Sequence, residues 1–200
     1  MIIALLLSAL ASAATPPATA DQAEALAARS NGAEAGRLWS TAGNVRLVAG
    51  DTAGAVRDFD KALALPNLSP VDRGEALLDR ARAAQAMGDL VTASARAAEA
   101  ARIVPSDPFV WYFRTALAIA AGDVPQAKLA IARALALAPE DPTVLFESGH
   151  VAQLAGEEAT ARAAWTKALA RDPNGRSGQA AREALALAGA PLTVHPIAER

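Results

Sequence analysis

A unit of 34 residues recurs along this chain and limits what the chain can fold into. Its clearest copy spans residues 108–141, where two stretches with helical spacing of apolar residues flank Gly122-Asp123. The unit returns with one glycine and one proline per copy: Gly88, Gly122 and Gly156, then Pro105, Pro139 and Pro173. A further glycine, Gly50, lies 38 residues before Gly88. A fixed period built from two helices predicts an array of stacked helical repeats.

The composition agrees with closely packed helices. Hydrophobic residues make up 52% of the chain, but much of this is alanine, with only three tryptophans, one tyrosine and four phenylalanines. Alanine has the highest helix propensity and allows helix backbones to approach each other closely. We therefore expect an all-α protein without a wide internal pocket.

Charge and cysteine usage exclude several classes of function. The 19 basic and 21 acidic residues are spread along the chain and leave a net charge of −2. Because no basic patch suited to phosphate backbones is present, we expect no nucleic-acid partner. The chain has no cysteine, which excludes disulfides and thiolate metal sites.

Residues 1–20 differ from the rest of the sequence. Ile2–Leu10 is nearly all apolar and small residues follow it, a pattern typical of a secretory signal peptide cleaved after Ala13, Ala14 or Ala20. No Lys or Arg precedes the apolar run, so a buried N-terminal helix or an uncleaved anchor are the alternatives. The run is shorter than the roughly 20 residues that span a bilayer. We predict a periplasmic or secreted protein without a stable membrane span after cleavage; a cytoplasmic location is the alternative.

Turn and capping residues divide the remaining chain into elements. A glycine followed by an aspartate predicts the turn within a repeat at Gly50-Asp51, Gly88-Asp89 and Gly122-Asp123. A capping side chain followed by proline predicts a helix start at Ser69-Pro70, Asp107-Pro108 and Asp141-Pro142. Asp21 and Glu24 have the spacing of a capping box and predict a short helix before the first repeat.

These signals give the predicted organisation. It comprises a signal peptide (1–20), an N-terminal capping helix (21–32), four repeats (36–66, 70–105, 108–139 and 142–173), a C-terminal capping helix (177–189) and a tail (190–200). The four extra residues before repeat two are close to one helical turn, so we expect them to lengthen its first helix at the N-terminus.

The units resemble tetratricopeptide repeats over roughly residues 36–173. The fourth position of the four repeats holds a bulky residue: Trp39, Leu77, Trp111 and Leu145. The eighth position holds a small residue: Gly43, Ala81, Thr115 and Gly149. The twentieth position holds Ala55, Ala93, Ala127 and Ala161, and the twenty-seventh holds Ala62, Ala100, Ala134 and Ala168. The twenty-fourth position holds a bulky residue in repeats one, three and four (Phe59, Ile131 and Trp165), whereas repeat two has Ala97 there.

The resemblance implies an all-α, right-handed tetratricopeptide-repeat helical solenoid of about four helix-turn-helix repeats plus a C-terminal capping helix. Small residues at the eighth and twentieth positions would let the two helices of a repeat pack closely, with bulky side chains filling the remaining space. No repeat can bury its apolar face alone, so stacking creates the core. Ala97 predicts a thinner, less stable junction around repeat two.

The resemblance also implies a concave groove lined by the first helix of each repeat. The residues that would line it for binding a partner are Arg37, Ser40, Asn44, Arg82, Gln85, Phe109, Tyr112, Ile119, Phe146, His150 and Gln153. With Arg37 and Arg82 at one end of an aromatic floor, this groove would suit an extended or helical peptide.

The aromatic residues of the third repeat have two interpretations. Helical spacing places Phe109, Tyr112 and Phe113 on one face, with Trp111 turned toward the repeat core. They either form an open groove floor or are covered by an N-terminal segment or a neighbouring helix. The sequence leaves both possibilities open.

No catalytic, cofactor or metal site is predicted. The two histidines, His150 and His195, lack the helical spacing of a metal pair, and no phosphate-binding loop or nucleophile elbow occurs. We therefore expect a non-catalytic scaffold that needs no cofactor and binds a protein or peptide partner. The alternative is a permanent structural subunit of an envelope complex or a homo-oligomer.

Overall fold

The structure is a computed structural model that describes residues 19–189. The predicted signal peptide before Thr19 and the tail with His195 lie outside the described residues. Within 19–189 the chain is all-α, and the fold class predicted from the sequence is confirmed. The helices are α1 (Ala20–Ala27), α2 (Gly32–Val48), α3 (Thr52–Ala64), α4 (Pro70–Ala86), α5 (Leu90–Ile103), α6 (Pro108–Ala120), α7 (Val124–Leu137), α8 (Pro142–Leu154), α9 (Glu158–Arg171) and α10 (Arg176–Gly189).

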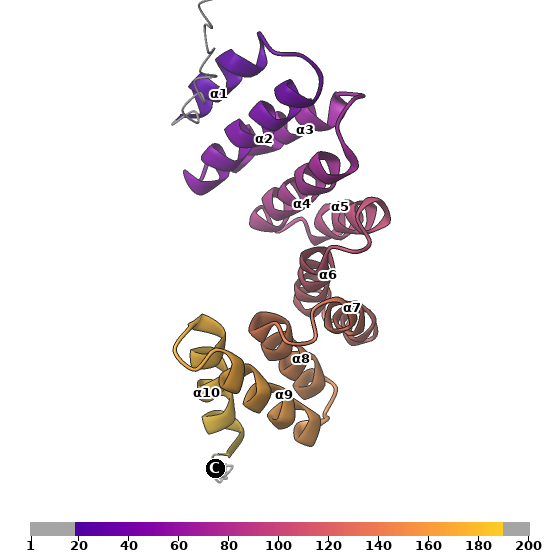
Figure 1. Cartoon of the computed structure of the whole chain (residues 1–200), viewed down its shortest axis with the longest axis vertical. Helices are drawn as coiled ribbons and strands as arrows, with labels where there is room; N and C mark the ends of the chain where they lie inside the picture. The colour runs from indigo at the N-terminus through magenta and orange to yellow at the C-terminus, as the bar shows by residue number, and fades with distance from the viewer. Residues whose placement is uncertain (1–18, 190–200) are drawn as a thin grey trace, which may run out of the picture.

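The helices form a solenoid in which each one packs on its neighbours in sequence. Four pairs, α2–α3, α4–α5, α6–α7 and α8–α9, are the helix-turn-helix repeats, and α10 packs on α8 and α9. Figure 1 shows the repeats following one another along the long axis, with α2, α4 and α6 on one side and α3, α5 and α7 on the other. The stack is bent, so that its two ends lie toward the side of the first helices.

The turns inside the repeats have the predicted conformation. The glycines at these turns have positive φ angles of 84°, 77°, 71° and 75° at Gly50, Gly88, Gly122 and Gly156. The aspartate after each of the first three glycines accepts a hydrogen bond from the backbone N–H three residues on: Asp51 from Gly54, Asp89 from Thr92 and Asp123 from Gln126. This arrangement satisfies an N–H group at the start of the second helix.

Two details at the N-terminus differ from the sequence prediction. Thr19, not Asp21, caps α1, because its hydroxyl oxygen accepts a hydrogen bond from the backbone N–H of Gln22. Helix α2 starts at Gly32, one turn earlier than expected, and this added turn buries Ala35. The prediction for repeat two is confirmed, since α4 begins at Pro70 and has 17 residues, compared with 13 in α6.

Side-chain volumes in the first and last repeats are complementary between the eighth and twenty-fourth positions. A Cβ atom on Gly43 would lie 2.6 Å from the Phe59 ring, and one on Gly149 would overlap the indole of Trp165. Both rings are fully buried. Glycine therefore stands where the facing position holds a large ring, as the close packing predicted from the repeat pattern requires.

Ala97 at the exceptional twenty-fourth position is completely buried. Its cluster includes Phe113 and Leu117 from the next repeat, with Ala81 at the eighth position of its own repeat. In repeat two, therefore, both the eighth and the twenty-fourth positions hold alanine, and side chains of α6 complete the cluster. The lower stability predicted for this junction stays a prediction.

Arg46 connects the first three helices. Its guanidinium donates to Glu24 of α1, to Asp58 of α3 at 2.9 Å and to Asp51 at 3.2 Å. Asp58 is 1% exposed, and its other oxygen accepts from Lys61 at 3.3 Å. The hydrogen bond from Arg46 lowers the pKa of Glu24, although burial acts in the opposite direction. The N-terminal end of the solenoid is therefore held by a charge network beside its small apolar core.

Candidate functional site

The candidate site is the face formed by the first helices α2, α4, α6 and α8, which we call the groove. All predicted groove residues belong to these four helices. Two clefts open along the groove, one between α2 and α4 and one between α6 and α8. We call the part on α2 and α4 the N-terminal half and the part on α6 and α8 the C-terminal half.

The N-terminal half is polar, and its two arginines are each paired with an aspartate of the protein. Arg37 Nη1 lies 3.4 Å from Asp72 Oδ2, and Arg82 Nη1 lies 3.2 Å from Asp79 Oδ1. The second oxygen of Asp79 accepts a hydrogen bond of 2.8 Å from Asn44 Nδ2. Both arginine side chains are more than half exposed, so a partner would meet cations that are already paired with aspartates of this protein.

The C-terminal half carries the aromatic residues. The Phe109 and Tyr112 ring centroids are 5.9 Å apart, and the Phe146 and His150 centroids are 4.4 Å apart in an edge-on arrangement. Phe109 is 47% exposed, whereas Phe113 turns into the core and is 7% exposed. Phe109 is therefore open among the described residues, and cover by the N-terminal segment before Thr19 lies outside them.

A cleft of about 250 Å³ lies beside these rings. Its lining residues are Pro108, Phe109, Tyr112, Asp141, Thr143 and Val144. Asp141 caps the N-terminus of α8, where its Oδ1 accepts hydrogen bonds from the backbone N–H groups of Thr143 and Val144. These bonds fix the position of its side chain. The same residue that caps α8 thus adds a carboxylate to the wall of the cleft.

Negative charge surrounds the Tyr112 hydroxyl. Burial raises the pKa of Tyr112, and the charges of Glu147 and Asp141 raise it further. The Glu147 side chain is only 14% exposed, and its Oε2 lies 3.5 Å from His150 Nδ1. This half of the groove therefore combines accessible rings with two carboxylates.

Six of the eleven predicted groove residues line neither cleft: Arg82, Gln85, Ile119, Phe146, His150 and Gln153. Gln85 is half-buried near the end of α4, and Ile119 packs against the core cluster of α7 and α8. Gln153 instead lines a separate cleft between α8, α9 and α10, together with Arg162 and Trp165. The structure thus brings Arg37, Ser40 and Asn44 together at one cleft and Phe109 and Tyr112 at the other.

The carboxylates are what the sequence interpretation missed. Asp79 and Glu147 occupy the sixth position of their repeats, a position that contributed no residue to the predicted groove. Asp72 lies in the extra turn of α4, and Asp141 was assigned only to capping. A sixth-position signal was present in the sequence, because both residues are acidic at the same place in two repeats.

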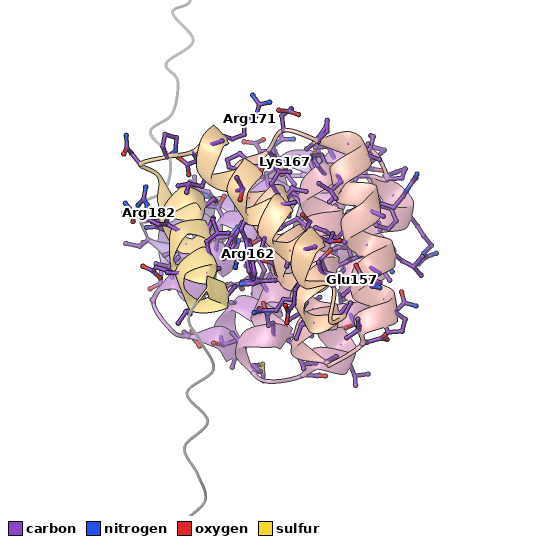
Figure 2. All side chains as sticks on the ribbon, turned by 90° about the horizontal axis from the view of Figure 1, so that it is seen from below. Glu157, Arg162, Lys167, Arg171 and Arg182 are labelled. Atoms are coloured by element: carbon purple, nitrogen blue, oxygen red, sulfur yellow. The ribbon has the colours of Figure 1, made fainter. Side chains whose placement is uncertain are left out.

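Basic side chains gather instead at the C-terminal end of the solenoid. Figure 2 views this end and shows Lys167 and Arg171 together on α9, with Arg162 between α9 and α10. Arg171 pairs with Glu140, and Arg182 Nη2 donates to the backbone oxygen of Pro173 at 2.8 Å. Within residues 19–189 no helix has the length and apolarity to cross a bilayer, and no group of three or more metal-ligating side chains comes together.

Comparison with known proteins defines the fold. No family model matches the sequence, and no curated protein matches it. A chain of the APC/C hetero-tetramer Cut9–Hcn1 is similar in structure, with a TM-score of 0.66 and 22% identity. The match covers 76% of this chain but 29% of the other, so the chain spans less than a third of that protein.

Two tetratricopeptide-repeat proteins are similar over most of the chain. YrrB, described as a TPR protein with an unusual peptide-binding site, is 17% identical with a TM-score of 0.62, covering 82% of this chain and 80% of YrrB. A tetratricopeptide repeat protein from Parabacteroides merdae is 14% identical with a TM-score of 0.69, covering 84% of this chain and 65% of the other. The chain therefore has the fold of a tetratricopeptide-repeat solenoid.

Proposed function

We propose that this solenoid is a non-catalytic scaffold whose groove binds a peptide or helix of another protein. The observation that carries the proposal is the open aromatic surface of the C-terminal half, where Phe109 is 47% exposed and Tyr112 and Phe146 are half-buried. Aromatic side chains held on a rigid face and left accessible are typical anchors of protein interfaces. The likeness to YrrB, a protein described as having a peptide-binding site, supports the same function.

The backbone of α8 beneath Phe146 is held in place by Trp165. Trp165 is 1% exposed and its Nε1 donates a hydrogen bond of 3.2 Å to the backbone oxygen of Phe146. The indole also packs against the backbone of Gly149 on the same helix. A preformed surface of this kind loses little conformational entropy when a partner binds.

Affinity capture from native envelope extract tests the proposal. The full chain is compared with Tyr112→Ala/Phe146→Ala and with the control Val91→Ala/Leu129→Ala, which truncates exposed apolar side chains on α5 and α7. We expect all three to have the same helical circular dichroism, and only the groove variant to lose the partner. If the groove variant retains the partner, the chain instead contacts its partner through another surface, as a permanent structural subunit would.

We also propose that the chain is exported and that its signal peptide is cleaved after Ala13 or Ala14. Thr19 caps α1, and Ala20 is buried in a cluster with Ala23 and Ala42. Cleavage after Ala20 would remove both the cap and a core residue. The intact mass of the chain isolated from the periplasm tests this: a start at Ala14 or Thr15 agrees with the proposal, and a start at Asp21 contradicts it.

A further inference from the structure

The two halves of the groove contain carboxylates in different states. In the N-terminal half, Asp72 and Asp79 are each paired with an arginine of the same protein. In the C-terminal half, Asp141 and Glu147 have no Lys or Arg partner among the described residues. Glu147 is 14% exposed with only His150 beside it, and Asp141 Oδ2 receives no hydrogen bond within residues 19–189.

One carboxylate and two aromatic rings line the same cleft. Asp141 lines it together with Phe109 and Tyr112. Glu147 lies on the next turn of α8 and does not line the cleft, but its charge and that of Asp141 both raise the pKa of Tyr112. A cationic side chain placed here would lie near the two rings and beside the Asp141 carboxylate, with the Glu147 carboxylate one turn further along α8, and aromatic rings and carboxylates both attract cations.

We infer that the C-terminal half of the groove recognises a basic side chain, lysine or arginine, flanked by apolar residues in the bound segment. The inference rests on the proposed function and adds the chemistry of the partner. The aliphatic stem of such a side chain would pack on Phe109 and Val144, while its charge would face Asp141 and Glu147. An acidic segment would meet unpaired carboxylates and would be rejected.

A random peptide library displayed on phage provides the probe. The full chain is used for selection, and the peptides retained are compared with those retained by Tyr112→Ala/Phe146→Ala. We expect the peptides specific to the unchanged chain to be enriched in Lys or Arg next to aromatic or aliphatic residues and depleted in Asp and Glu. A selected pool without this bias would overturn the inference.

Charge-neutral variants locate the recognition. Glu147→Gln preserves the shape of the side chain, and Asp141→Asn preserves the helix cap because Asn caps as well as Asp does. We expect the double variant to bind a selected peptide about tenfold more weakly, by loss of charge–charge and cation–π attraction. Glu75→Gln is the matched control, an exposed carboxylate in the N-terminal cleft, and should change affinity less than about twofold.

The outcomes separate this inference from the proposed function. If no peptide distinguishes the chain from Tyr112→Ala/Phe146→Ala, the groove is not a peptide site and both proposals fail. If peptides bind through the aromatic residues but are indifferent to Glu147→Gln/Asp141→Asn, only the recognition of a basic side chain fails. Replacing the basic residue of the peptide with norleucine should weaken binding to the unchanged chain but have little effect with the double variant.

Discussion

The two halves of the groove are built from the same kind of repeat, yet they differ in whether their aspartates are paired with basic side chains. In the N-terminal half, Arg37, Asn44 and Arg82 satisfy Asp72 and Asp79 within the protein. In the C-terminal half, Asp141 and Glu147 lie beside exposed rings without a cationic partner among the described residues. The two arginines of the first half are thus paired within the protein, whereas the second half presents carboxylates and an exposed ring side by side.

The same difference continues behind the groove. At the N-terminal end, Arg46 joins three helices through carboxylates that include the buried Asp58. In the third repeat, Arg114 has no carboxylate partner within residues 19–189 and lies 4.9 Å from the centroid of the Trp111 ring. Burial lowers the pKa of Arg114. Stability should therefore depend on ion pairs in the first repeat and on packing in the later ones.

The largest effect is expected from Arg46→Met. It leaves the Asp58 carboxylate buried with only Lys61 nearby, and the free energy of unfolding should fall by about 3 kcal/mol. Arg114→Met is the matched change in the third repeat and should cost less than about 1 kcal/mol, the value of a partly exposed cation–π contact. Urea unfolding measures both. Equal losses would contradict the division between the two regions.

A smaller loss is expected from Gly149→Ala, which tests the packing behind the C-terminal half. The new Cβ would overlap the buried Trp165 indole, and this overpacking should lower the free energy of unfolding by about 1–3 kcal/mol. The higher helix propensity of alanine offsets about 1 kcal/mol of that loss. Displacing Trp165 would also strain its hydrogen bond to Phe146, so peptide affinity should fall together with the melting temperature.

Gly36→Ala is the control for this substitution in the N-terminal half. Its Cβ would overlap a methyl group of Leu68 and approach Leu68 Cγ at 3.3 Å and Leu65 Cδ1 at 3.6 Å. Leu68 is a flexible, partly exposed side chain that can rotate away. This variant should be as stable as the unchanged chain or slightly more stable. A loss in Gly36→Ala as large as that in Gly149→Ala would show that the buried ring is not the cause.

Acid should loosen the N-terminal repeat before the C-terminal one. Hydrogen bonding by Arg46 lowers the pKa of Glu24 from 4.5, and hydrogen bonding by the Gly54 N–H lowers that of Asp51 from 3.8. The stability they contribute is complete above these ordinary values and is lost as pH falls through the lowered folded-state values. Hydrogen exchange measured on acidification should therefore rise in α1 and α2 first. Earlier exchange in α8 and α9 would contradict this.

The sequence was sufficient for the fold because the repeat pattern, turn glycines and helix caps all depend on local spacing. It was also sufficient to place Phe109 and Tyr112 on the groove. It did not reveal that Arg37 pairs with Asp72 and Asn44 with Asp79, since each pair joins residues 35 positions apart on different helices. Such pairing depends on how one repeat is rotated on the next, and the extra turn of α4 alters which residues meet.

The smallest effect concerns Tyr112, and it measures directly the negative potential that distinguishes the C-terminal half. Tyr112 is the only tyrosine in the chain, so the tyrosinate absorbance band reports its titration alone. Burial and the charges of Glu147 and Asp141 raise its pKa above 10.0, and the stability this contributes is complete below pH 10.0 and is lost as pH rises through the folded-state value.

Glu147→Gln and Asp141→Asn should each move the Tyr112 titration midpoint back toward 10.0, whereas Glu75→Gln should leave it unchanged because Glu75 belongs to the other cleft. Circular dichroism at the same pH values establishes that the helices are intact during the titration. If the titration midpoint is the same in Glu147→Gln and Asp141→Asn as in the unchanged chain, burial alone raises the pKa of Tyr112. The two carboxylates would then not act together at this ring, and the reason to expect a basic side chain there would disappear.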